Sequence, residues 1–127
     1  MNDLIKIAIV GVGGRMGRHL LQTIYASGYL GAAIARSGSF IVGQDAGEFA
    51  GLGQIGLKII DDLQQVIDDV DVVIDFSTLA STLKHIQICE QSGTPIVIGT
   101  TGFNVEQLHV IQKASKKLQL FSQLIIQ

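Results

Sequence analysis

Residues 5–17 read IKIAIVGVGGRMG, and this stretch decides the fold of the chain. Residues 5–10 are apolar apart from one lysine and rich in β-branched side chains, which is typical of a strand buried on both faces of a parallel sheet. Four glycines follow within residues 11–17, and apolar residues then recur at helical spacing over 16–24. A strand, a glycine turn and a helix start in this order predict an anion site. Glycine lets a phosphate approach the backbone, and the free N–H groups of the first helical turn face it.

The spacing of the glycines indicates how specific this signal is. The strict dinucleotide pattern has glycine at its first, third and sixth places, which here are Gly11, Gly13 and Met16. The spacing that fits is a looser variant with Gly11, Gly14 and Gly17. Its position between a strand and a helix favours a dinucleotide site. The alternative is a turn that only packs the helix close to the strand.

Composition excludes several classes of protein. Of the 127 residues, 47% are hydrophobic and 16% charged, which predicts a single globular domain with a substantial core. A net charge of −2 with scattered Lys and Arg argues against a nucleic-acid partner. No apolar run is long enough for a membrane span. Cys89 is the only cysteine, which excludes an internal disulfide and agrees with a cytoplasmic location. The three histidines lack metal-ligand spacing, so we expect no metal site.

Strand and helix patterns alternate along the chain. Beyond the strand over 5–10 we expect a helix over 15–27 that Gly28 ends, a strand over 30–35, a long loop over 38–56, a short strand over 57–60, a short helix over 62–69, a strand over 70–76, a helix from Ser77 or Thr78 to Gly93, a strand over 95–98, a helix over 104–117 and a sixth strand over 118–126. This alternation predicts an α/β fold with a doubly wound parallel sheet of the Rossmann type. Residues 1–127 would then form one dinucleotide-binding domain that ends within or just after its sixth strand.

Ligands of such sheets bind beyond the carboxyl ends of the strands. The loops expected at that edge are 11–17, 35–39, 76–78 and 99–103, and all of them are polar or glycine-rich. Right-handed crossovers place the first, fourth and fifth strands side by side. We therefore expect these loops to converge on one ligand.

The end of the second strand predicts which dinucleotide binds. An Asp or Glu at this point bonds the ribose 2′-hydroxyl of NAD, whereas an Arg suits the 2′-phosphate of NADP. Residues 34–37 read IARS, without a carboxylate. The planar guanidinium of Arg36 holds a phosphate through two bonds, and Ser37 adds a hydroxyl. We predict that NADPH is preferred and that NADH stays possible. The alternative for Arg36 is a solvated surface charge.

Five segments together resemble one family. They are GVGGRMG (11–17), GAAIARSGS (31–39), DAGEFAG (45–51), VDVVIDFS (70–77) and VIGTTGF (97–103). In this order and spacing they resemble the dihydrodipicolinate reductases, also called 4-hydroxy-tetrahydrodipicolinate reductases, over roughly residues 5–121. The resemblance implies an oxidoreductase of lysine and diaminopimelate biosynthesis. Such an enzyme uses NADH or NADPH to reduce a cyclic imine-type dicarboxylate to tetrahydrodipicolinate.

The resemblance also implies a set of site residues. Residues 11–16 match the pyrophosphate loop, Arg36 the 2′-phosphate contact, Phe76 and Ser77 a wall of the crevice, and residues 99–101 the loop beside the nicotinamide and the substrate. The implied cofactor-binding residues are Gly11, Val12, Gly13, Gly14, Arg15, Met16, Arg36, Phe76, Ser77, Gly99, Thr100 and Thr101. Thr101 is also the implied substrate contact, and no catalytic residue is assigned.

Family members carry a second domain that recognises the substrate and supplies a proton, and the 127 residues contain no such part. We therefore expect this chain alone to bind cofactor and to turn over poorly or not at all. A dicarboxylate substrate would bind only if the second domain is supplied. Asp75 is interpreted as a local backbone cap. The histidines are interpreted as exposed or partly packed helix residues. No catalytic pair is predicted among these residues.

Two other functions stay open. One is a stand-alone module that binds or senses NADPH or another nucleotide without catalysis. The other is a binder of coenzyme A or a different adenine nucleotide, in which Arg36 meets a 3′-phosphate. The oligomeric state is left open as well.

Overall fold

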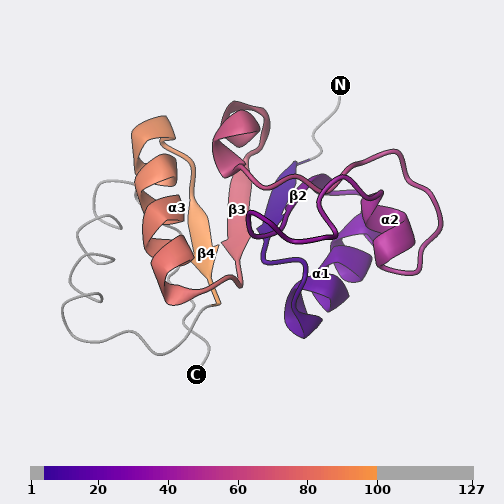
Figure 1. The fold of residues 1–127 in the computed structure, drawn as a ribbon. Helices are drawn as coiled ribbons and strands as arrows, with labels where there is room; N and C mark the ends of the chain where they lie inside the picture. The colour runs from indigo at the N-terminus through magenta and orange to yellow at the C-terminus, as the bar shows by residue number, and fades with distance from the viewer. Residues whose placement is uncertain (1–4, 100–127) are drawn as a thin grey trace.

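The computed structural model of the chain describes residues 5–99. Within them, β1 (Ile7–Val10), β2 (Leu30–Ile34), β3 (Val72–Asp75) and β4 (Ile96–Ile98) form one parallel sheet in the order β2-β1-β3-β4. The helices are α1 (Arg15–Ala26), α2 (Ala46–Phe49) and α3 (Leu79–Ser92), with the short 3-10 helices η1 (Leu63–Gln65) and η2 (Ile67–Asp69) before β3. Figure 1 shows α1 and α2 beside β1 and β2, and α3 beside β4.

The sheet separates two hydrophobic clusters, because successive strand side chains point to opposite faces. On one face Ile9 of β1 joins a cluster with Leu21 of α1 and the buried Ile41. On the other face Val10 joins a cluster with Ile86 of α3. Helices thus cover both faces, which confirms the predicted doubly wound α/β fold.

The predicted boundaries of α3 are confirmed, and the cap among the two candidates is Thr78. Its side-chain oxygen accepts a hydrogen bond from Ser81 N at 3.3 Å. Gly93 ends the helix with a left-handed φ of 73°, a conformation that glycine adopts without strain. Cys89 is buried on this helix, and burial together with the Asp75 carboxylate raises the pKa of its thiol to about 12. The thiol is therefore a packed apolar group.

The prediction of an unstructured loop over 38–56 is wrong in part, because this segment contains α2. Asp45 starts this helix, and its Oδ1 accepts hydrogen bonds from Gly47 N at 2.9 Å and Glu48 N at 3.1 Å. The same carboxylate also accepts from Ile55 N at 3.0 Å and Gly56 N at 2.7 Å. One side chain thereby fixes both ends of the segment.

Asp45 gives the first testable prediction. The backbone N–H groups of Ile55, Glu48, Gly56 and Gly47 lower the pKa of Asp45 below its ordinary value of 3.8. A carboxyl whose pKa is lower in the folded chain stabilises it above the unfolded pKa, and this contribution disappears as the pH falls through the folded pKa. We expect Asp45→Ala to lower the melting temperature at pH 7, with the difference from wild type shrinking steadily below pH 3.8. Thermal melts of both proteins at several pH values measure this. A constant difference down to pH 2 would contradict it.

Two further expectations for the segment before β3 are wrong. Residues 57–60 form no regular strand, because Lys58 pairs antiparallel with Asp45 while Ile60 pairs parallel with Ile34. The partner changes within three residues, so no ladder extends. Residues 62–69 form η1 and η2 instead of one helix, since Val66 between them has φ −122° and ψ 1°, which is not a helical conformation. The predicted helix over 104–117 and strand over 118–126 lie outside the described residues.

Candidate functional site

The carboxyl ends of the strands meet at one edge, as the sequence predicts. Gly11 N donates to Ile34 O at 2.8 Å, and Phe76 N donates to Val10 O at 2.9 Å. Gly99 N likewise donates to Asp75 O at 2.8 Å. These bonds carry the ladder one residue beyond the strands and place the glycine turn between the ends of β2 and β3.

Two glycines of the turn are needed for close packing. Gly11 has a φ of +93°, and a Cβ there would lie 2.7 Å from the carbonyl carbon of Phe76. A Cβ on Gly17 would overlap the carbonyl oxygen of Gly11. For these two positions the packing interpretation of the glycine pattern holds, because the turn, β3 and α1 touch backbone to backbone.

Gly13 and Gly14 are different, because both are exposed and an added Cβ would make only ordinary van der Waals contacts. A Cβ on Gly13 would lie 3.4 Å from Ile41 Cδ1, and one on Gly14 would lie 3.6 Å from Gly11 O. Packing alone therefore gives little reason for glycine at these two positions. Their backbone is accessible from outside, which is what a bulky anion requires.

The start of α1 has no side-chain cap. Gly14 is its N-cap residue, and the first turn contains no acid. By contrast, Asp45 caps α2, Thr78 caps α3 and Asp62 caps η1. The first N–H groups of any helix lack intrahelical acceptors, and the helix dipole makes this end positive. Arg15 in the same turn adds a like charge, which an anion would offset.

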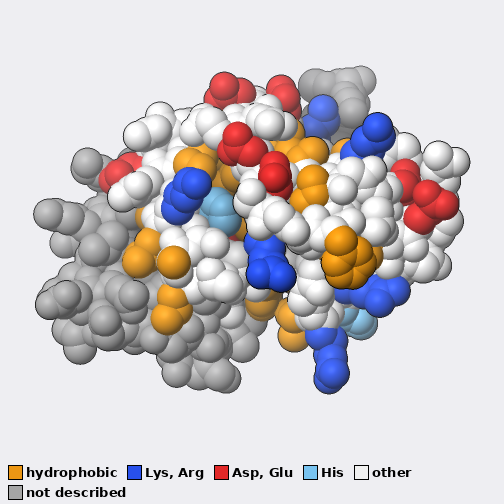
Figure 2. Space-filling model, in the orientation of Figure 1, with side chains coloured by type: hydrophobic (Ala, Val, Ile, Leu, Met, Phe, Trp, Pro, Cys, Tyr) orange, Lys and Arg blue, Asp and Glu red, His pale blue; other side chains and the backbone are white. Residues whose placement is uncertain are grey.

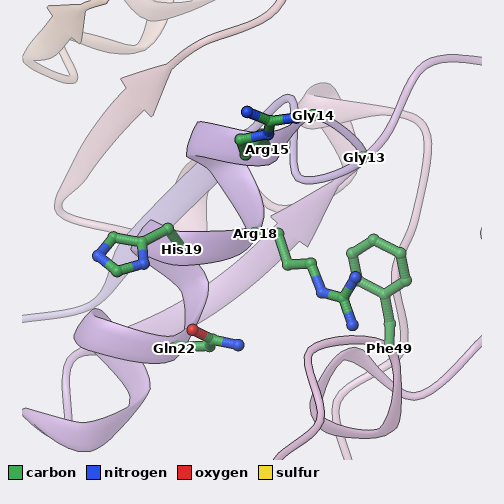
Figure 3. Close-up of a pocket in the computed structure, with 7 residues that line it drawn as sticks. All are labelled: Gly13, Gly14, Arg15, Arg18, His19, Gln22 and Phe49. Atoms are coloured by element: carbon green, nitrogen blue, oxygen red, sulfur yellow. The ribbon is translucent and has the colours of Figure 1, made fainter.

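A pocket of about 390 Å³ opens beside this turn. It is lined by Gly13, Gly14, Arg15, Arg18, His19, Gln22 and Phe49 (Figure 3). The close-up shows Arg18 reaching from α1 toward Phe49 on α2, with the guanidinium carbon 5.1 Å from the ring centroid. Gln22 Nε2 donates to Ala50 O at 2.7 Å, which ties α1 to the end of α2.

Sequence reasoning found three of the pocket residues and missed four. Gly13, Gly14 and Arg15 were expected, whereas Arg18, His19, Gln22 and Phe49 were not. The helical spacing of Arg18, His19 and Gln22 after Arg15 was a usable signal, because positions three, four and seven apart share a helix face. Phe49 had no such signal, since its place depends on α2.

Val12 and Met16 also belong to the predicted pyrophosphate loop, but neither of them lines the pocket. Val12 is fully buried and its N–H donates to Ile34 O at 3.2 Å, so its side chain packs the turn against the sheet. Met16 is 51% exposed in the first turn of α1 and lies outside the lining of the pocket.

Basic and acidic side chains are distributed unevenly over the surface. In the view of Figure 2, the visible Asp and Glu side chains lie mainly in the upper half and at the right, together with several Lys or Arg side chains and a His, whereas the lower edge carries Lys or Arg side chains and a His. The lower edge is also where β4 ends and α1 begins in Figure 1. The electrostatic surroundings of the carboxyl edge therefore favour an anion.

Arg36 and Ser37 lie exposed at the end of β2, as expected. The structure adds a carboxylate that the sequence did not indicate, because Asp61 Oδ2 lies 3.5 Å from Ser37 Oγ. Asp61 follows directly after Ile60, whose pairing with Ile34 brings it to this edge. The local sequence at the end of β2 contains no carboxylate, as stated, but the fold brings the carboxylate of Asp61 to this point.

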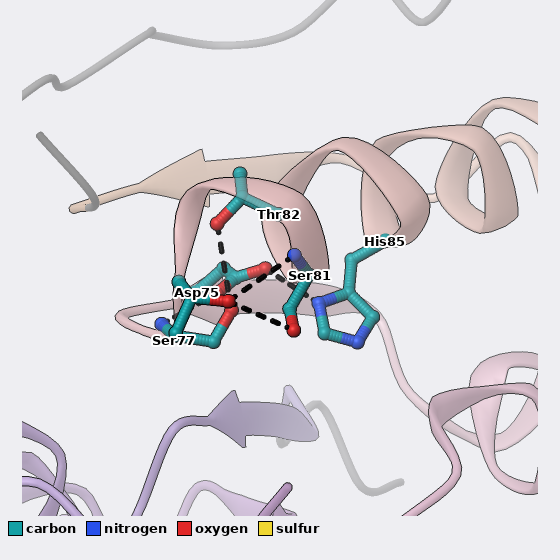
Figure 4. A network of polar contacts seen from close by, with 6 residues as sticks. Asp75, Ser77, Ser81, Thr82 and His85 are labelled. Carbon is teal, nitrogen blue, oxygen red and sulfur yellow. Dashed lines mark hydrogen bonds and ion pairs between the residues drawn. The ribbon is translucent and has the colours of Figure 1, made fainter. Parts of the chain in front are cut away.

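Phe76 and Ser77 form the loop after β3, and a buried network holds it (Figure 4). Asp75 is fully buried; its Oδ1 accepts from Ser77 N at 2.8 Å and from Ser77 Oγ at 2.5 Å. Its Oδ2 lies 2.8 Å from Nδ1 of the half-buried His85. Asp75 does cap the local backbone, as predicted, and it pairs with His85 as well.

This network is not a nucleophilic triad. In a triad the serine hydroxyl donates to a histidine that an acid orients. Here the hydroxyl of Ser77 donates to Asp75, and the carboxylate stands between serine and histidine. The arrangement positions the Phe76–Ser77 loop. No cluster of His, Cys, Asp or Glu suited to a metal occurs among residues 5–99, and no helix in the same part of the chain is long and apolar enough to cross a membrane.

Gly99 completes the described part of the edge. A Cβ on Gly99 would overlap the ring of Phe76, so this ring lies directly on the backbone of the loop after β4. Thr100 and Thr101 lie outside the described residues. The turn, the Phe76 loop and Gly99 are thus adjacent in space.

Comparison with known proteins decides the family. A family model described as "Dihydrodipicolinate reductase, N-terminus" matches residues 5–124. The chain belongs to this family. A 4-hydroxy-tetrahydrodipicolinate reductase of Acinetobacter baumannii (strain AYE) is 49% identical over 119 residues, and one of Psychrobacter arcticus is 46% identical over 119. These matches cover 93% and 92% of this chain but 44% and 43% of the relatives. The chain therefore spans less than half the length of these dihydrodipicolinate reductases.

Solved structures agree with the fold. A dihydrodipicolinate reductase from Paenisporosarcina sp. TG-14 with bound dipicolinate is similar with a TM-score of 0.64 and 26% identity, over 90% of this chain and 43% of that one. A UDP-N-acetylglucosamine 3-dehydrogenase from Acidithiobacillus ferrooxidans reaches a TM-score of 0.72 at 16% identity, over 96% of this chain and 38% of that one. The second likeness shows the fold alone. The relatives are named as reductases, so the resemblance seen in the sequence is confirmed.

Proposed function

We propose that this chain forms the cofactor site of an NAD(P)H-dependent reductase and that the glycine turn holds the pyrophosphate. The observation that carries this is the open backbone at Gly13 and Gly14, which lines a pocket together with Arg15 and Arg18 at the uncapped start of α1. An anion there would accept from the free N–H groups and offset two like charges. The proposal includes the cofactor-binding residues predicted for this turn, which are residues 11–16.

The chemistry follows from the family. Bound NAD(P)H supplies the hydride. The described residues of this chain would bind and orient the cofactor, with the Phe76–Ser77 loop and Gly99 forming one wall. We propose that the substrate is a cyclic imine-type dicarboxylate of lysine and diaminopimelate biosynthesis. The dipicolinate bound by the Paenisporosarcina relative is a flat dicarboxylate of the same kind. A cytoplasmic location fits the free Cys89.

A binding screen tests the cofactor site. We expect calorimetric titration of the 127-residue chain to show the tightest binding for NADPH, weaker binding for NADH and none for coenzyme A. Absence of heat with all three ligands would contradict the proposal. Tightest binding of coenzyme A would favour the adenine-nucleotide alternative instead.

Arg36 tests the preference for NADPH. Because a hydrogen bond to a charged group contributes about 1.5–3 kcal/mol, we expect Arg36→Ala to weaken NADPH at least about 10-fold and to leave NADH within about 2-fold. Lys84→Ala is the matched control, since Lys84 is an exposed cation on α3, over the other face of the sheet. Equal losses for both cofactors would contradict a contact between Arg36 and the 2′-phosphate.

A substitution of Asp61 also tests the preference for NADPH, and it is expected to increase that preference where Arg36→Ala decreases it. The Asp61 carboxylate beside Ser37 repels a 2′-phosphate and is able to accept from a ribose 2′-hydroxyl. We expect Asp61→Asn to strengthen NADPH about 3-fold and to weaken NADH by a similar factor at low salt, because exposed charges contribute about 0.2–1 kcal/mol. Titrations at two salt concentrations measure this. Unchanged affinities would place Asp61 outside the site.

A further inference from the structure

Phe40 is the large apolar side chain that the described part of the chain exposes most. It is 89% exposed, whereas the next in order, Met16, is 51% exposed. Its neighbour Ile41 is buried in the core beside α1. Burial of a whole phenyl ring is favourable by roughly 1.5–3 kcal/mol relative to exposure, so a ligand that covered this ring would gain affinity from it.

The backbone holds Phe40 in this outward position. Ser39 N donates to Arg36 O at 3.1 Å, and Val42 N donates to Ser39 O at 3.2 Å, which makes two successive turns. Gln44 Nε2 donates to the carbonyl of Phe40 at 3.4 Å. With Ile41 anchored in the core, the turns direct the ring of Phe40 to solvent at the carboxyl edge of β2.

The first of these turns runs from Arg36 to Ser39, and Phe40 follows it directly in the chain. If Arg36 binds the 2′-phosphate, the adenine lies close by, because adenine and phosphate are attached to adjacent carbons of one ribose. Adenine is flat and π-rich, and a phenyl ring is a sequence-tolerant platform for stacking. We propose that Phe40 stacks on the adenine of the dinucleotide. This inference rests on the proposed function and adds the group that recognises the base.

A tryptophan at this position reports stacking directly. The chain contains no tryptophan, so Phe40→Trp gives a single emitter. Titration with adenosine 2′,5′-bisphosphate, which has no nicotinamide, is expected to quench its emission. Tyr25→Trp is the control, because Tyr25 is 42% exposed near the end of α1, away from the carboxyl edge. Equal quenching in the two variants, or none in Phe40→Trp while the bisphosphate binds by calorimetry, would overturn the proposal.

Removal of the ring gives a second measurement. We expect Phe40→Ala to weaken NADPH and the bisphosphate about 10-fold, while reduced nicotinamide mononucleotide, which lacks adenine, keeps its affinity. The melting temperature should stay unchanged because the ring is exposed. Equal loss for the mononucleotide, or a change in sedimentation that identifies Phe40 as a contact between chains, would overturn the inference. If the wild-type chain binds none of these ligands, both the proposed function and the stacking are overturned. If the wild-type chain binds them and Phe40→Ala binds them equally well, only the stacking is overturned.

Discussion

Replacement of Gly17 by alanine is expected to destabilise the chain strongly and to abolish cofactor binding. The added Cβ would overlap the carbonyl oxygen of Gly11 and lie 2.9 Å from Val12 Cα. These are backbone atoms at the junction of β1 and α1, so no side chain can rotate away. Overpacking usually costs 1–3 kcal/mol, and we expect about 3 kcal/mol at this junction. Urea unfolding followed by circular dichroism measures the stability, and calorimetry with NADPH measures the binding.

Gly14→Ala is the matched control for this prediction. A Cβ on Gly14 would lie at an ordinary 3.6 Å from Gly11 O, and its φ of −82° suits any residue. We expect a loss of about 1 kcal/mol or less, because alanine is only a poorer N-cap than glycine. If Gly17→Ala is no more costly than Gly14→Ala, the close approach of helix and strand is not what the third glycine of the pattern serves.

The sequence predicted those features that depend on neighbouring residues. The strands β1 and β3 were predictable because they are rich in β-branched apolar residues, which is typical of strands buried on both faces of a parallel sheet; Asp75 at the end of β3 is their one polar residue. The helix α3 was predictable at both ends, since Thr78 caps the first turn and Gly93 provides the left-handed ending. The order of these elements was sufficient to predict the sheet and the edge where its loops meet.

Features that depend on distant residues were beyond this reasoning. Asp61 comes to Ser37 only because Ile60 pairs with the end of β2. Phe49 reaches Arg18 only because Asp45 folds the segment that contains α2. Each contact joins residues more than twenty positions apart, and neither helical nor strand periodicity encodes such a separation. The pocket was therefore predicted at the glycine turn and missed along its far wall.

Asp75 carries the second large effect. Its fully buried carboxylate accepts from Ser77 N, from Ser77 Oγ and from His85. Asp75→Ala removes the carboxylate that these three groups share as their acceptor. A buried donor that loses its acceptor usually costs about 1–3 kcal/mol, and for the group of donors around Asp75 we expect a total loss of about 4 kcal/mol in the free energy of unfolding. Asp71→Ala is the control, because Asp71 is exposed, accepts from Lys6 N at 2.8 Å, and should cost about 1 kcal/mol.

A structural loss and a loss of positioning are separable with Asp75→Asn and His85→Ala. Asparagine keeps an acceptor for Ser77 N but lacks the charge that pairs with His85, so we expect an intermediate loss of stability. If the pair acts as a unit, the double variant costs less than the sum of the two single variants, with a coupling of about 1–3 kcal/mol. Because Phe76 contacts both Gly11 and Gly99, loosening of this loop should also weaken NADPH in folded Asp75→Asn under conditions where the variant is fully native. Additive stabilities with unchanged NADPH affinity would mean that Asp75 and His85 are merely neighbours and that the loop is held by its backbone bonds alone.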